Sequence, residues 1–126
     1  MSAGRYSFTI EQGSTLNLEL QYKDGNGNRM DLSDYGGRMQ IRPSVGSATI
    51  YLTLSSSLEA DGTGLNFSGS NGQTPPSSGS IGMYISAASS SALNFDMGVY
   101  DLEIYSGSFV TRILEGQIKL SKEVTR

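Results

Sequence analysis

The residues that could bind a metal ion lie in one short polar run of the sequence, DGNGNRMD. The run offers four oxygen-bearing side chains at close spacing: Asp24, Asn26, Asn28 and Asp31. Side chains two positions apart in a turn can converge on one cation, as the oxygen ligands of a calcium loop do. The EF-hand pattern, however, requires Gly at its sixth position and Glu at its twelfth, where this chain has Arg29 and Tyr35. We therefore predict a hairpin turn here and no metal site.

This chain lacks several of the residue types that most often catalyse reactions. The sequence contains no cysteine and no histidine, which removes thiolate nucleophiles, the usual zinc sites and the commonest general base. Asp101 and Glu103 form a pair of carboxylates on one side of an expected strand, where solvated surface charge is the default interpretation. The sequence therefore predicts that the protein is not an enzyme and that it uses no cofactor.

The seven tyrosines are the residues best suited to holding a sugar, because an aromatic face can stack on a glycan ring. Three of them share the phase of inward aliphatic residues and are expected in the core or at a sheet edge: Tyr6, Tyr22 and Tyr100. Three others fall on the outward phase and are better candidates for contact with a ligand: Tyr51, Tyr84 and Tyr105. A carbohydrate-binding module thus stays open as one function class.

Charge and hydropathy limit the possible partners. The net charge is −3 and the nine Lys and Arg residues are scattered, so a groove that follows nucleic-acid phosphates is not expected. No apolar run approaches the roughly 18 residues of a membrane span, and the opening MSAGRYSFTI lacks the pattern of a secretion signal. We therefore expect neither a nucleic-acid partner nor a membrane partner.

Short runs of alternating apolar residues predict an all-β protein of about eight strands in a single domain over residues 1–126. The runs cover residues 6–10, 16–22, 38–42, 50–54, 65–67 and 81–85, and a C-terminal hairpin follows from residue 98. Only residues 86–93 look helical, as a short turn with Ser86 as its N-cap. Strands this short, each with one apolar side, fit two packed antiparallel sheets.

The C-terminal hairpin predicts a specific pairing of side chains. Ser106 and Gly107 supply the turn between two alternating runs. If these two residues are the whole loop, Asp101 lies opposite Arg112, whereas a three-residue loop would shift the register by one. A bulge or bend is expected near residues 114–116, where the apolar alternation changes.

Several segments resemble those of a family of small tailed-phage virion proteins: YSFTIEQG, DLSDYGGRMQIR, GVYDLE, VTRILEG and the terminal VTR. Such proteins are similar to the immunoglobulin-like N-terminal domain of siphophage upper baseplate proteins. The resemblance covers the first forty-odd and the last thirty residues. It implies an immunoglobulin-like β-sandwich that is made in the host cytoplasm and located in the virion. It also implies a symmetric oligomer whose partners are other virion proteins of the tail, baseplate or capsid.

The first functional hypothesis is therefore a tail or baseplate adaptor that acts through protein–protein contacts, for example where fibres attach. A capsid decoration protein is the alternative, and the carbohydrate-binding module is a second alternative. Contacts are expected from the N-terminal segment, from outward tyrosines, from a flexible Ser/Gly/Pro-rich loop over 69–80 and from the tail over 121–126. The predicted interface residues are Arg5, Tyr6, Tyr51, Asn71, Gln73, Pro75, Pro76, Tyr84, Lys122, Val124 and Arg126.

Overall fold

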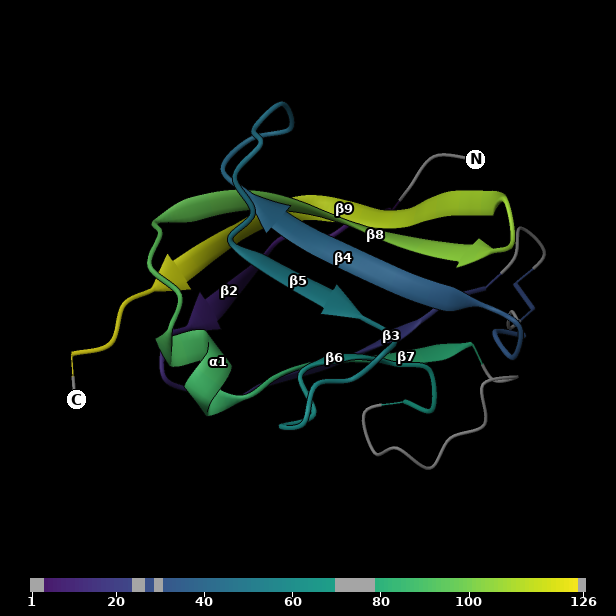
Figure 1. Cartoon of the computed structure of the whole chain (residues 1–126), viewed down its shortest axis with the longest axis horizontal. Helices are drawn as coiled ribbons and strands as arrows, with labels where there is room; N and C mark the ends of the chain where they lie inside the picture. Colours follow the sequence, from purple (N-terminus) through teal and green to yellow (C-terminus); the bar gives the residue numbers. More distant parts are fainter. Residues whose placement is uncertain (1–3, 24–26, 29–30, 70–78, 125–126) are drawn as a thin grey trace.

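The chain folds into two facing β-sheets, shown in Figure 1 by a computed structural model that describes residues 4–23, 27–28, 31–69 and 79–124. The larger sheet has the strand order β1-β9-β8-β4-β5, with β2 also paired to β9. Its strands are β1 (Gly4–Arg5), β2 (Phe8–Glu11), β4 (Gly36–Arg42), β5 (Leu52–Ser55), β8 (Met97–Ser106) and β9 (Phe109–Ser121). The smaller sheet has the order β3-β7-β6, from β3 (Leu16–Gln21), β6 (Gly64–Asn66) and β7 (Ser80–Ile85). The predicted all-β sandwich is confirmed.

The core lies between the two sheets and contains the side chains that the alternation placed inward. Successive side chains of a strand point to opposite faces, so one face of each strand can be buried while the other meets solvent. The central strands contribute fully or almost fully buried residues: Met39, Ile41, Ile81, Met83, Ile85, Tyr100, Leu102 and Ile104. Ile50 is an exception, because β5 begins only at Leu52 and Ile50 is exposed.

The first strands of the chain run parallel to the last strand, which corrects the expectation of purely antiparallel sheets. Gly4 pairs with Leu114 in β9, and Phe8 pairs with Ile118. The amide of Tyr6 donates to the carbonyl of Glu115 at 2.9 Å, so the connection between β1 and β2 also follows β9. Alternation reports which side chains face inward, but it carries no information about the strand partner or its direction.

The hairpin between β8 and β9 turns one residue later than predicted. Ser106 pairs with Phe109, which leaves Gly107 and Ser108 as the loop, and Gly107 has a positive φ of 59°. Glycine adopts this left-handed conformation without the steric cost that a Cβ atom imposes, so Gly107 fixes the position of the turn.

A bulge at Ile113 changes the register of the same hairpin. Glu103 pairs with Arg112, whereas Asp101 pairs with Glu115, because the register shifts by one residue between these two pairs. The bulge therefore lies just before the predicted range 114–116, and Asp101 does not lie directly opposite Arg112, the register expected for a Ser106–Gly107 loop. The two side chains still meet diagonally, with Arg112 Nε 3.4 Å from Asp101 Oδ2.

The helix α1 (Ala87–Ser91) closes one end of the sandwich, the end at which β2 and β9 finish (Figure 1). Ser86 is its N-cap, as predicted, because its Oγ accepts a hydrogen bond from the Ser89 amide at 3.0 Å. Asp61 accepts a hydrogen bond from Ser86 Oγ at 2.5 Å and so ties the β5–β6 connection to this helix. Within the described part of the chain, no helix is long and apolar enough to cross a membrane.

Candidate functional site

The side of the larger sheet that faces away from the core carries a dense set of charged and polar side chains. Strands β4 and β8 bury alternate residues in the core, so the residues between them point outward. On the neighbouring strand β9, the residues that pair with outward residues of β8 share this side of the sheet: Arg112, Glu115 and Gln117. This surface, termed the outer face, consists of Arg38, Gln40, Arg42, Val99, Asp101, Glu103, Arg112, Glu115 and Gln117. Because β4 and β8 are neighbours in the sheet, residues some sixty positions apart in the sequence lie side by side here.

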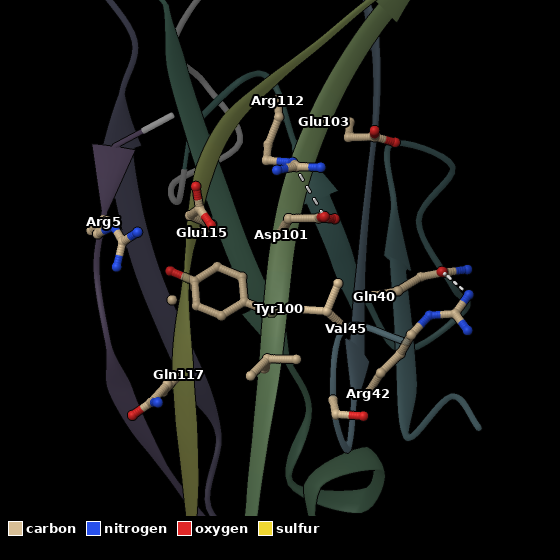
Figure 2. Close-up of a pocket in the computed structure, with 13 residues that line it drawn as sticks. Arg5, Gln40, Arg42, Val45, Tyr100, Asp101, Glu103, Arg112, Glu115 and Gln117 are labelled. Carbon is tan, nitrogen blue, oxygen red and sulfur yellow. Dashed lines mark hydrogen bonds and ion pairs between the residues drawn. The ribbon is translucent and has the colours of Figure 1, made fainter. Parts of the chain in front are cut away.

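A hollow of about 520 Å³ opens on the outer face, with charged groups of both signs around it (Figure 2). Tyr100 and Gly116 line it from within the sheet, and Arg5 joins it from β1. Ser44 and Val45 line it from the β4–β5 connection, which projects beyond the larger sheet (Figure 1). The volume is in the range of ligand sites, but such sites are mostly apolar, whereas charged and polar side chains dominate here. The hollow therefore suits polar or charged groups of a partner.

Ion pairs fix the direction of several of these charges. Arg38 Nε lies 3.0 Å from Glu103 Oε1, and the guanidinium of Arg38 also lies over the ring of Tyr105, 5.4 Å from its centroid. Arg112 pairs with Asp101 as described above. These side chains are partly exposed to solvent, and exposed ion pairs contribute only about 0–1 kcal/mol each to folding. Their main effect is to arrange charge on the surface.

Three carboxylates lie close together at the centre of the outer face: Asp101, Glu103 and Glu115. Burial raises the pKa of Asp101 above its ordinary value, and the positive charge of Arg112 only partly opposes this shift. The carboxylates of Glu103 and Glu115 raise the pKa further, because negative neighbours disfavour ionisation. Glu115 lies directly opposite Asp101 in the sheet, a like-charge pairing that destabilises two adjacent strands. A positively charged or hydrogen-bonding partner group would relieve this repulsion.

The next question is whether acidic side chains of the described residues gather into a possible metal site. Among those residues, no group of three or more acidic, cysteine or histidine side chains could hold a metal ion. The predicted hairpin turn over 24–31 lies partly outside the described residues, since Asp24 and Asn26 do. Asp31 makes a local turn instead, because its Oδ1 accepts hydrogen bonds from the amide of Ser33 at 2.9 Å and from its hydroxyl at 2.5 Å.

Two predicted interface residues, Arg5 and Tyr6, lie in the N-terminal segment that runs along β9. Arg5 pairs with Glu115 across the parallel strands and lines the hollow. Tyr6 is 44% exposed and lies between β1 and β2, at the edge of the larger sheet, which agrees with the expectation that it belongs to the core or to a sheet edge. Its ring stacks on that of Phe8, with 5.7 Å between the ring centroids.

The other two described tyrosines of the predicted interface, Tyr51 and Tyr84, do not join this site. The ring of Tyr51 stacks on Phe95, with 4.4 Å between the centroids and 4° between the planes, and packs against the core. The expectation that Tyr51 points outward is therefore wrong, because it precedes β5 and does not follow the alternation of that strand. Tyr84 is partly buried on β7, in the smaller sheet. The outward tyrosines thus form no common aromatic surface.

The C-terminal tail is held by its own chain as far as residue 123. Lys122 Nζ lies 3.2 Å from Asp96 Oδ1, and the amide of Glu123 donates to Gln12 Oε1 at 2.9 Å. Val124 is exposed. Nearly all of the predicted flexible loop over 69–80 lies outside the described residues. So do the remaining predicted interface residues, which are Asn71, Gln73, Pro75, Pro76 and Arg126.

The outer face as a site is not predicted from the sequence. Alternation with Met39, Ile41, Leu102 and Ile104 indicates that the polar residues of β4 and β8 point outward, and for Asp101 and Glu103 it favours solvated surface charge. The available signal was the presence of both charge signs at outward positions in RMQIR, YDLEI and TRILEG. The missing information was the strand order, because alternation does not place β4 beside β8.

Comparison with known proteins supports the fold. No protein-family model and no curated protein sequence matches the chain. Among solved structures, the chain is similar to a marsupial T cell receptor, with a TM-score of 0.50 and 14% sequence identity. The match covers 95% of this chain and 51% of the receptor chain, so this chain spans about half of the receptor chain's length. The predicted immunoglobulin-like β-sandwich is thereby confirmed.

Proposed function

We propose that this chain is a structural protein of a tailed-phage particle, a subunit of the tail or baseplate that binds other virion proteins and catalyses no reaction. The observation that carries the proposal is the outer face. Charges of both signs are held there on three neighbouring strands around a hollow. The particle itself is inferred from the resemblance of the N-terminal and C-terminal segments to small virion proteins.

A surface with charges of both signs is better suited to recognising a partner than to stabilising the fold. Complementary charges across an interface give partner specificity and rapid association more than they give folding stability. Arginine is enriched at protein–protein interfaces, and the outer face with its rim contains four arginines: Arg5, Arg38, Arg42 and Arg112. Because exposed ion pairs contribute little to the fold, recognition of a partner is the better explanation for their ordered arrangement.

The experiment that tests this function is quantitative mass spectrometry of purified virus particles from the source of the chain. It would count copies of this chain relative to the major capsid protein and the tail-tube protein. Closed ring symmetry predicts roughly six to a few dozen copies per particle for a tail or baseplate subunit. Hundreds of copies would replace this proposal with a capsid decoration protein. The absence of the chain from intact particles would overturn any structural role in the virion.

A further inference from the structure

The charges of the outer face are sorted by strand. On β8 the charged outward residues are the acidic pair Asp101 and Glu103, whereas on β4 they are the basic pair Arg38 and Arg42. The register aligns them in rows across the two strands, with Arg38 beside Glu103 and Gln40 beside Asp101. One strand is thus negative and its neighbour positive along the same stretch of the surface.

We propose that the outer face binds the outer face of a second copy of this chain, about a two-fold axis that runs parallel to the strands between β4 and β8. Such a rotation keeps each residue in its row and exchanges the two strands. β8 of one copy then lies over β4 of the other, and the same contacts occur twice, as in any two-fold contact. Glu103 comes to lie over Arg38 of the second copy, and Asp101 over the amide of Gln40.

The next strands outward support the same axis. The rotation places β9 over β5 of the second copy, so Arg112 meets the row of Ser55 and Glu115 meets the row of Thr53. Neither of these hydroxyl residues carries a charge, and both can accept or donate a hydrogen bond. No like charges meet in these rows.

A two-fold axis placed between β8 and β9 would instead bring like charges together. If the axis lay between β8 and β9, Glu103 would meet Arg112 of the second copy, but Asp101 would meet Glu115. Two carboxylates would then face each other across the interface. Like-charge contacts across an interface suppress wrong arrangements. Of these two axes, the charge pattern favours the one between β4 and β8.

Exposed apolar side chains at both ends of the outer face strengthen the inference. Val110 is 47% exposed beside Tyr105 at one end. Met97 is 52% exposed and Val45 is 92% exposed at the other end. Large apolar side chains left in water mark interaction surfaces when they gather on one face. A second copy laid on the outer face would bring these ends into contact with protein.

This inference goes beyond the proposed function, because it concerns contacts between two copies of this chain. The purified chain alone is enough to test it. Absence of the chain from virus particles would leave the dimer standing, and a monomeric chain would leave a virion role standing. The two proposals can therefore fail independently.

The test is sedimentation equilibrium of the purified chain and of charge-reversal variants on β4 and β8. The wild-type chain is expected to form dimers. In a dimer, Glu103→Arg places an arginine over Arg38 of the second copy, and Arg38→Glu places a glutamate under Glu103 of the second copy. Each variant alone is expected to dimerise at least about tenfold more weakly than the wild type. Circular dichroism of each variant shows whether it is folded.

Mixing the two variants provides the decisive comparison. In a mixed dimer the new arginine lies over the new glutamate at one contact, and the native Glu103–Arg38 pair forms at the other. The mixture should recover wild-type dimerisation, which a loss of folding could not produce. The double variant Arg38→Glu/Glu103→Arg keeps the ion pair within the chain and the complementarity between copies, so it should dimerise like the wild type.

Three outcomes would overturn the proposal. They are a wild-type chain that stays monomeric up to millimolar concentration, single variants that dimerise as well as the wild type, and a mixture of folded variants that does not recover.

Discussion

Tyr100 shows how a single side chain joins distant parts of the fold. Its ring is buried, and its hydroxyl donates to the backbone carbonyl of Tyr6 at 2.5 Å, which connects β8 with the β1–β2 segment. Burial also raises the pKa of this hydroxyl well above its ordinary value.

Replacement of Tyr100 by Phe should lower the free energy of unfolding by about 1–2 kcal/mol, because the Tyr6 carbonyl loses its donor in a partly buried place. Urea unfolding measures this change. The matched control is Tyr105→Phe, which removes a hydroxyl from the adjacent outward-facing tyrosine and should change stability by less than about 0.5 kcal/mol. Equal effects of the two substitutions would contradict the assigned role of the hydrogen bond.

Asp61 makes the stability of the protein depend on pH. The hydroxyl of Ser86 and, to a lesser extent, the amide of Thr63 hold the pKa of Asp61 well below its ordinary value. A carboxyl group whose pKa is lower in the folded state stabilises the fold above its unfolded pKa, about 3.9, and this contribution is lost as the pH falls toward the folded value.

The wild type should therefore be more stable than an Asp61→Asn variant at neutral pH, and the difference should shrink as the pH drops below about 4. Thermal unfolding of both proteins across this pH range measures the effect. Asp34→Asn, which changes an exposed carboxylate elsewhere, serves as the control. A stability difference between wild type and Asp61→Asn that stays constant down to low pH would contradict the assignment.

At the scale of elements, Gly116 allows the N-terminal segment to cross β9. A Cβ atom at this position would lie 2.1 Å from the carbonyl oxygen of Tyr6 and 3.2 Å from Cε1 of Tyr100. The backbone of Tyr6 must therefore move if Gly116 becomes Ala, and the hydrogen bonds that hold the β1–β2 connection on β9 would weaken.

We expect Gly116→Ala to destabilise the protein by about 1–3 kcal/mol, the usual cost of forcing extra atoms into a packed site. Hydrogen exchange of the Tyr6 amide should become faster in this variant. Gly46→Ala is the control, because a Cβ atom there meets nothing within 4 Å. An unchanged exchange rate at Tyr6 would show that the crossing does not depend on Gly116.

The strands were predictable where a single face is buried. β3 and β8 alternate regularly, and the N-cap of α1 is local to Ser86 and Ser89, so sequence alone was enough for them. The pairing of strands was not predictable in the same way. The parallel partner of β2 and the bulge at Ile113 depend on contacts between segments far apart in the chain. The outer face was missed for the same reason, since it exists only because β4 lies beside β8.

At the scale of the whole molecule, the two sides of the larger sheet have separate roles. The inner side packs against the smaller sheet and supplies most of the core, which at 126 residues is large enough to stabilise a fold that lacks cysteines. The outer side adds little to that stability, because its ion pairs are exposed to solvent. Its charges are therefore available for recognition, and substitutions there should alter association more than folding.

The central claim is that the outer face is the surface through which this protein works. The most direct measurement is carbodiimide labelling of carboxylates, read by mass spectrometry, in the free chain at low concentration and in purified virus particles. Labelling of Glu103 and Glu115 should fall strongly in the particle, whereas Glu59, in the exposed β5–β6 connection, should keep a larger share of its labelling. Equal labelling of Glu103 and Glu115 in both states would contradict the claim.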